Sequence, residues 1–231
     1  GHFPTDAQGV LIVDRYSAYK AMKQVQAGKL ILVFCWAHVR RDFVRVGKGY
    51  PELKEWALRW LRQIRELYRL HRERRQHELL SPEYAQADAA LREQIATMCQ
   101  QRDAELADTK LREPCRKVLT SLTEHWSGLT VFLDDPRIPL DNNFAEQLMR
   151  NPAVGRKNYY GSGAEWAGRL ATMMFSILAT LKLWKINPRL WLTWYLESCA
   201  TAGSKAPADI ESFLPWNLSD ESRSQLANRA S

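Results

Sequence analysis

The fold is decided by residues 9–36, GVLIVDRYSAYKAMKQVQAGKLILVFCW. GVLIVD at 9–14 and LILVFCW at 30–36 are continuous apolar runs rich in β-formers, which is typical of strands buried in a parallel sheet. The residues between them have room for a helix closed by Gly28, as a crossover between parallel strands requires. We therefore expect Asp14 and the Cys35–His38 segment to emerge together at the carboxyl ends of the strands, where open α/β sheets bind ligands.

A long helical block follows, from residue 51 to residue 134. Apolar residues recur there at gaps of three and four, and arginines fill the positions between them. Ser81 provides a cap for a helix predicted over 82–112, and Pro114 opens a further helix that reaches Leu133. The pattern predicts a large all-helical insertion after the strands, so the chain should be α/β in class but predominantly helical overall.

The stretch DNNFAEQLMRNPAVGRKNYYGSG, residues 141–163, predicts a short helix followed by a loop. Asp141 is a good N-cap, and Pro152 should stop the helix near Asn151. On that helix Asn142, Glu146 and Arg150 share one stripe, with Asn143 beside it. Beyond a glycine-bearing loop at 155–163 we expect an apolar helix at 164–185, a tryptophan-rich helix from Asn187-Pro188 to about 200, and a loosely packed tail.

Composition narrows the class of partner. The chain of 231 residues has a formal net charge of +7, with 9 Trp and 8 Tyr, which favours a polyanionic partner. Its four cysteines have no regular disulfide spacing, so we expect a reducing, cytoplasmic compartment. No signal peptide is visible, and the longest apolar run, Leu170 to Leu181, is too short for a membrane span and is interpreted as a buried helix.

Three carboxylates are candidates for a shared metal site: Asp14, Asp141 and Glu146. Magnesium prefers carboxylate oxygens, and two such ions can drive in-line phosphoryl transfer. The alternative is structural: Asp14 ends a strand, Asp141 caps a helix and Glu146 pairs with Arg150. Cys35 and His38 have the spacing of half a zinc site without a second half, so His38 is more plausibly a neighbour that orients the acid site, or a residue that closes the strand.

Basic segments are candidates for phosphate contacts. Arg40 and Arg41 follow His38, and Arg156, Lys157 and Asn158 lie beside two tyrosines in the glycine-bearing loop. The arginine ladder from residue 59 to residue 75 has the same two interpretations, a nucleic-acid surface or a solvated face paired with acids such as Glu66.

Several of these motifs together resemble the insertion-sequence-66 family of bacterial transposases. The spacing Asp141-Asn142-Asn143-x-x-Glu146-x-x-x-Arg150, followed by GRKN at 155–158 and GS at 161–162, is similar to the carboxyl-terminal signature of that family. VDRYSAY, CWAHVRRDF, KINPRLWL and FLPW are similar to its other motifs in the same order. The resemblance covers nearly the whole chain.

The resemblance implies an RNase H-like core of the DDE type, in which two aspartates and a glutamate hold two Mg²⁺ ions, with Mn²⁺ as a substitute. Asp14 matches the second aspartate and Glu146 the glutamate. His38, Asp141, Asn142, Asn143 and Arg150 match supporting positions, and Arg156 and Lys157 match basic positions that would hold DNA phosphates. Arg40, Arg41 and Asn158 are further candidates for DNA contacts. The implied partners are the transposon ends and target DNA, a second copy of the chain on DNA, and accessory transposition proteins, in a nucleoid-associated setting with no membrane.

The family's first aspartate has no match among these residues, because Asp6 is too close to Asp14. We therefore expect an incomplete RNase H-like core, a fragment that does not cut DNA alone. The expected segments are a partial core at 1–50, the helical insertion at 51–134, the glutamate helix, basic loop and C-terminal helices at 135–200, and a tail at 201–231. A non-catalytic DNA-binding module that regulates a full-length transposase, and a helical structural protein with incidental basic charge, remain the alternatives.

Overall fold

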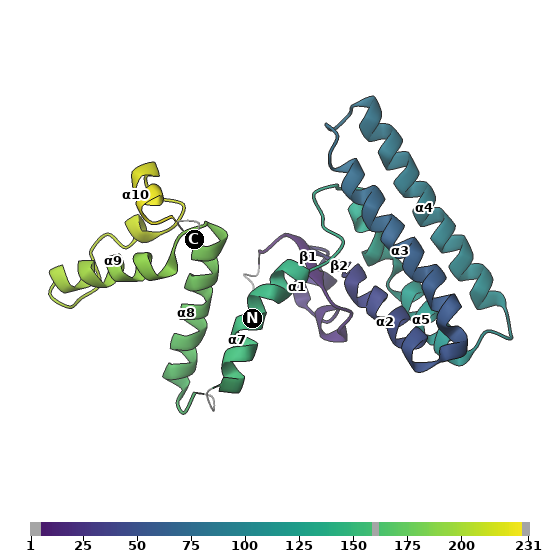
Figure 1. The fold of residues 1–231 in the computed structure, drawn as a ribbon, viewed down its shortest axis with the longest axis horizontal. Coiled ribbons are helices and arrows are strands. Elements are labelled where there is room, and N and C mark those ends of the chain that lie inside the picture. The colour runs from purple at the N-terminus through teal and green to yellow at the C-terminus, as the bar shows by residue number, and fades with distance from the viewer. Residues whose placement is uncertain (1–5, 159–161, 228–231) are drawn as a thin grey trace. The chain divides into compact units, whose positions relative to one another are not determined.

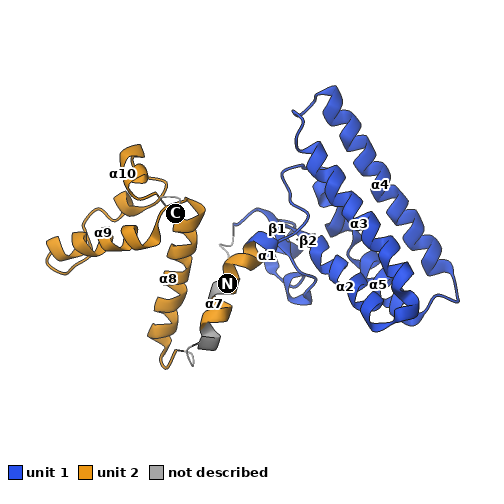
Figure 2. Cartoon of the chain, in the orientation of Figure 1, with its two compact units in different colours: residues 1–144 blue, residues 145–231 orange. Residues whose placement is uncertain are grey.

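The computed structural model describes residues 6–158 and 162–227, apart from the side chains of Asn151 and residues 156–158. The described chain is predominantly helical and contains one small parallel sheet (Figure 1). It divides into two compact units, residues 1–144 and residues 145–231 (Figure 2), each with a hydrophobic cluster of its own.

The sheet of the first unit consists of β1 (Gly9–Val13) and β2 (Leu30–Phe34), paired in parallel from Gly9 opposite Leu30 to Val13 opposite Phe34. Both predicted strands are therefore confirmed. The predicted crossover helix is wrong in extent: the connection contains only a 3₁₀ turn, η1 (Ser17–Tyr19), and one helical turn, α1 (Lys23–Gln26). Two turns suffice because strands of five residues need only a short return path.

A helix closes over the second strand. α6 (Trp126–Thr130) contacts β2, and Gly128 lies so close that an added Cβ would stand 2.5 Å from Phe34 Cδ2. The short helix η3 (Val131–Leu133) continues from it. The helix predicted from Pro114 to Leu133 is thus interrupted: α5 (Glu113–Glu124) ends at His125, which leaves α6 free to approach the strand.

The helical block consists of α2 (Trp36–Gly49), the 3₁₀ turn η2 (Pro51–Leu53), α3 (Lys54–Arg74), α4 (Pro82–Ala107) and α5, which pack against one another. The α3–α4 and α2–α3 pairs form its most extensive helix contacts. The apolar stripe predicted on α3 is buried, including Trp60, Ile64 and Leu67. Ser81 caps α4 as predicted, accepting the Tyr84 N–H at 3.1 Å, but this helix ends at Ala107 and not at residue 112.

Buried polar groups tie this block together. Trp56 and Trp60 donate their indole N–H groups to one carboxylate oxygen of Glu105, at 2.7 and 3.1 Å. The fully buried guanidinium of Arg74 pairs with Asp88 at 2.6 Å and donates to the carbonyl of Phe132 at 2.7 Å. These bonds offset most of the cost of removing the polar groups from water, although Arg74 Nε is buried without a hydrogen-bond partner among the described residues.

α7 (Asn143–Asn158) corrects two predictions about residues 141–163. The helix does not stop near Asn151 but continues through Pro152, and residues 155–158, predicted as loop, belong to its last turns. A proline inside a helix removes one N–H donor and costs about 3 kcal/mol, but it can kink a helix without ending it. Of the remainder of the predicted loop, residues 159–161 lie outside the described residues, and residues 162–163 belong to no helix or strand.

The second unit contains α8 (Glu165–Leu183), α9 (Pro188–Thr201), η4 (Glu211–Phe213) and α10 (Asp220–Gln225). Asn187 caps α9 as predicted, accepting the Arg189 N–H at 3.0 Å. The tail is better packed than predicted, because Phe213 and Leu218 are buried with Leu181 and Trp191, and Trp191 donates to the Phe213 carbonyl at 2.9 Å.

The predicted burial of Leu170–Leu181 is wrong for most of that run. Trp166, Leu170 and Met173 of α8 are 70%, 48% and 56% exposed, and only the end of the helix, including Leu181, reaches the cluster of the second unit. An apolar sequence predicts a helix that can be buried, but burial also needs a facing surface within the unit. Among the described helices, none is both long and apolar enough to cross a membrane.

Candidate functional site

The carboxyl ends of the two strands bring the first predicted site residues together. Asp14 follows β1 directly, and the Cys35 N–H donates to the Val13 carbonyl at 3.0 Å, which places the start of α2 beside it. Asp14 is half-buried, and its Oδ1 accepts the Tyr16 N–H at 3.0 Å. The predicted meeting of Asp14 with the Cys35–His38 segment at one sheet edge is confirmed.

A third segment reaches the same edge from more than a hundred residues away. The Trp36 N–H donates to the Leu140 carbonyl at 2.8 Å, and the Trp36 indole donates to the Leu129 carbonyl at 2.8 Å. The first bond holds Leu140 against the turn that follows β2, and the second ties the same turn to α6. The amide oxygen of Asn142 is buried there without a hydrogen-bond partner in the described part of the chain.

The Cys35 thiol is completely buried at this turn. Burial raises the pKa of this thiol. The effect of burial is larger than the opposite effect of the backbone N–H groups of Asn142 and His38, which favour the thiolate. A buried, protonated thiol is a poor metal ligand. The zinc hypothesis for Cys35 and His38 gains no support, since the residues that the structure describes include no group of three or more His, Cys, Asp or Glu able to hold a metal.

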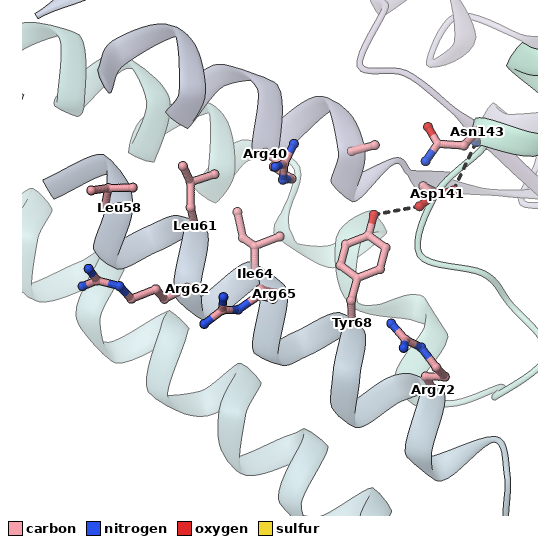
Figure 3. A pocket seen from close by; sticks show the side chains of 11 residues that line it. Arg40, Leu58, Leu61, Arg62, Ile64, Arg65, Tyr68, Arg72, Asp141 and Asn143 are labelled. Atoms are coloured by element: carbon pink, nitrogen blue, oxygen red, sulfur yellow. Dashed lines mark hydrogen bonds between the residues drawn. The ribbon is translucent and has the colours of Figure 1, made fainter. Parts of the chain in front are cut away.

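Asp141 connects this edge to two helices. Its Oδ2 accepts the Tyr68 hydroxyl of α3 at 2.9 Å, and its Oδ1 accepts the Asn143 N–H at 3.1 Å (Figure 3). The second bond confirms that Asp141 caps the start of α7, although the helix itself begins two residues later. Burial and the neighbouring carboxylate raise the pKa of Tyr68, so its hydroxyl stays a donor.

Arg15 is a site residue that the sequence did not single out. Its guanidinium pairs with Asp42, donates to Ser121 Oγ at 2.9 Å and approaches the His38 carbonyl at 3.4 Å. Arg15 therefore fastens the end of β1 to α2 and α5, directly beside Asp14. The sequence signal that could have identified Arg15 was its position next to Asp14 in VDRYSAY. The His38 side chain is half-buried in the first turn of α2.

Glu146 and Arg150 lie on exposed turns of α7, in the second unit. Asp14 lies in the first unit, so the shared metal site of Asp14 and Glu146 stays a prediction. The side chains of Arg156, Lys157 and Asn158 lie outside the described residues, and their proposed DNA contacts stay predictions as well.

The remaining basic candidates fall on the surface of the helical block. Arg40 and Arg41 are exposed on α2, and Arg40 lines a cavity of about 630 Å³ with three arginines of α3 and with Asp141 and Asn143 (Figure 3). The α3 arginines of this cavity are Arg62, Arg65 and Arg72. Spacing alone does not separate them from the rest of the ladder: Arg69 pairs with Glu66 and Glu73 of its own helix, whereas the partner of Arg74 is Asp88 of α4.

The first unit offers few carboxylate oxygens to the divalent metal expected at this site. Asp14 offers a carboxylate at the expected sheet edge, whereas both oxygens of Asp141 already accept hydrogen bonds. Within the described residues, then, the first unit supplies one well-placed acid and no complete set of metal ligands.

Comparison with known proteins agrees with the resemblance seen in the motifs. The family model "Transposase IS66 family" matches residues 2–170, a range that includes both Asp14 and Glu146. Two similar proteins of Sinorhizobium fredii are y4jD and y4qI, both described as uncharacterized. The chain is 34% identical to y4jD over 229 residues and 29% identical to y4qI over 220 residues.

These matches cover 95% and 91% of this chain but only 43% and 39% of the two relatives. A third protein of the same organism, y4hP, is 25% identical over 224 residues, 39% of its length. The chain thus spans about two fifths of the curated relatives that it matches. No solved structure gives a significant match.

Proposed function

This chain belongs to the IS66 family of transposases, and on that basis we propose that it is part of a transposase that cleaves DNA strands and transfers them by metal-dependent phosphoryl transfer. The observation that carries the proposal is the family match across both candidate acids, together with the place of Asp14 at the carboxyl edge of a parallel strand pair. Carboxyl edges are where sheets of this type place their chemistry.

We assign the catalytic carboxylates to Asp14 and Glu146. The two strands and the helices around them are the part of an RNase H-like core that this chain contributes. Asp14 and Glu146 would hold Mg²⁺ or Mn²⁺, which when bound activates the attacking oxygen and stabilises the leaving one. Arg15 keeps the end of β1 rigid, and Asp141, Asn142 and Asn143 determine where the helix that carries Glu146 begins.

Residues 1–231 have no match for the family's first aspartate, and the described residues contain no group of three acids. We therefore propose that the chain alone does not cleave DNA. A second candidate function follows from the same observation: the isolated chain binds DNA without cutting it and acts as a dominant-negative partner of a complete transposase. The transposon ends, the target DNA, self-association on DNA and accessory proteins are the partners that either function requires.

A plasmid-nicking experiment tests the assignment. Purified residues 1–231 would be incubated with supercoiled plasmid and Mg²⁺, beside y4jD and beside a chimera in which residues 1–231 replace the matching segment of y4jD. We expect no nicking by residues 1–231. We expect nicking by the chimera, and its loss in the chimera variants Asp14→Asn and Glu146→Gln.

The outcomes separate the two functions. Nicking by residues 1–231 that disappears in Glu146→Gln would show that the chain already contains a complete site. Nicking by the chimera that persists in both variants would show that neither acid is catalytic. Inhibition of y4jD by added residues 1–231, in proportion to their concentration, would favour the regulatory function.

A further inference from the structure

One side of α3 carries arginines that have no acidic partner. Arg62, Arg65 and Arg72 are exposed, as are Arg40 on α2 and Arg75 just beyond α3. None of these five forms an ion pair with a carboxylate of the described residues. Two other arginines of the same helix do form ion pairs: Arg69 pairs with Glu66 at 2.7 Å and with Glu73 at 2.6 Å, and Arg74 pairs with Asp88.

The unpaired arginines share a continuous hollow. The cavity of about 630 Å³ contains Arg40, Arg62, Arg65 and Arg72, and a second cavity of about 400 Å³ contains Arg72 and Arg75. Tyr68, Arg72 and Asp141 line both cavities, so the two adjoin. We call this hollow the arginine groove. Figure 3 shows Arg62, Arg65 and Arg72 in succession along α3, with Arg40 facing them from α2.

The groove contains one carboxylate against five guanidinium groups. Asp141 is the sole acid among its lining residues, and its two oxygens are already hydrogen-bonded to the Tyr68 hydroxyl and the Asn143 N–H. Like charges held close together repel one another, so a concave surface with five free guanidinium groups focuses a positive potential. A ligand with several regularly spaced negative charges would relieve that repulsion.

The other residues that line the groove indicate that it recognises the charge of its ligand. The floor is formed by the aliphatic side chains of Leu58, Leu61 and Ile64, and Tyr68 is the one aromatic residue of the larger cavity. Its ring is half-buried and its hydroxyl is engaged by Asp141. Single-stranded nucleic acids need a series of aromatic platforms for their bases, which this surface lacks.

We propose that the arginine groove binds the phosphate backbone of duplex DNA without regard to sequence. From Arg62 to Arg75 the helix advances 13 residues, or roughly 20 Å, which is about six base-pair steps of 3.4 Å. Asn143, the first residue of α7, also lines the groove. The choice of DNA as the polyanion rests on the proposed function, whereas the groove itself rests on the unpaired arginines.

The test compares two triple variants of residues 1–231 that lose the same charge. The groove variant is Arg62→Ala, Arg65→Ala and Arg72→Ala. The control is Arg69→Ala, Arg92→Ala and Arg112→Ala, which removes three exposed arginines that already form ion pairs. Binding to two unrelated 20-base-pair duplexes would be followed by fluorescence anisotropy in EDTA over a range of salt concentrations, after circular dichroism has shown that each variant is folded.

Each phosphate contact contributes about 0.9 to the slope of log K against log salt. We expect the groove variant to reduce the magnitude of that slope by about 2 to 3 and to lose at least tenfold in affinity for both duplexes at about 100 mM salt. The control should lose no more than about threefold, and a triple Arg→Lys variant of the groove should retain most of the binding because lysine also neutralises phosphate.

Three results would overturn the proposal: equal losses in the two triple variants, a loss for one duplex but not the other, or no duplex binding by the parent chain. Binding of single strands or of polyglutamate more tightly than duplex, with the same dependence on the groove, would identify a different occupant. The assay contains no divalent metal, so its outcome does not depend on Asp14 or Glu146. Failure of the nicking experiment would not contradict DNA binding by the groove. Failure of the binding experiment would not contradict the catalytic assignment of Asp14 and Glu146.

Discussion

Single residues decide how closely the elements of the first unit approach. Gly128 of α6 faces β2, and an ideal Cβ at this position would lie 2.5 Å from Phe34 Cδ2 and 3.0 Å from the Leu32 carbonyl oxygen. Glycine is required here for space and not for its backbone freedom, because a helical residue has ordinary φ and ψ angles.

Gly128→Ala should therefore destabilise the protein. The Phe34 ring is buried and cannot move aside freely, and overpacking of a core typically costs about 1 to 3 kcal/mol. Urea unfolding followed by tryptophan fluorescence would measure the change. Gly49→Ala, where a Cβ meets nothing within 4 Å, is the control and should be neutral or slightly stabilising. Equal stability of the two variants would contradict the packing argument.

His71 makes the stability of the first unit dependent on pH. Burial, reinforced by the positive charges of Arg74 and Arg75, lowers its pKa to about 4. The folded state thus favours the neutral ring, whereas the unfolded chain takes up a proton near the ordinary value of about 6.5.

The stabilising contribution of neutral His71 is complete above about pH 6.5 and is lost as the pH falls toward 4. We expect the unfolding free energy of the parent protein to decline over that interval. His71→Gln, which does not titrate, should decline less over the same interval, so the two curves converge at low pH. Parallel curves from pH 7 to pH 4 would show that His71 does not contribute.

At the scale of elements, a single hydrogen bond joins α3 to the start of α7. The Tyr68 hydroxyl donates to Asp141, and Asp141 in turn caps the first N–H of α7. Tyr68 therefore positions Asp141, the carboxylate that caps the start of α7.

Tyr68→Phe removes only the hydroxyl and should lower the unfolding free energy by about 1 to 2 kcal/mol, as expected for a bond to a charged acceptor. Asp141→Asn should cost a similar amount. A double-mutant cycle tests the link, because two residues that act through one bond give a double variant less destabilised than the sum of the single variants. Strict additivity would show that Tyr68 and Asp141 act independently.

At the scale of the whole molecule, the chain has two separate cores. Every buried residue of the larger cluster lies between Val13 and Leu140, and the smaller cluster lies between Leu181 and Leu218. The contact boundary falls within the first turn of α7, between residues 144 and 145. Unfolding of one cluster need not expose the other.

Residues 1–142 expressed alone should therefore fold and unfold cooperatively. Their core is contained within that range, although Asp141 loses the Asn143 N–H that it caps. We expect the thermal midpoint to match the main transition of the full chain, to within the few degrees that one lost bond of about 1 kcal/mol produces. A broad, non-cooperative transition would show that residues after 142 complete the core.

Much of the fold could be predicted from sequence because it depends on local pattern. The strands at 9–14 and 30–36, the caps at Ser81 and Asn187, and the buried stripe of α3 follow from periodicity and capping chemistry that act within a few residues. Parallel pairing then brings Asp14 and Cys35 to one edge, so this part of the candidate site was also predictable.

The remainder depended on contacts between distant segments, which local pattern does not contain. The close approach of Gly128, the link of Arg15 to Asp42 and Ser121, and the pairing of Arg74 with Asp88 each join residues brought together only by folding. The same holds for the arginine ladder: periodicity placed its members on one helix, but only the tertiary structure showed which of them face carboxylates. Charge neutralisation requires proximity in space, and that is why the unpaired arginines of the groove could be identified only in the folded chain.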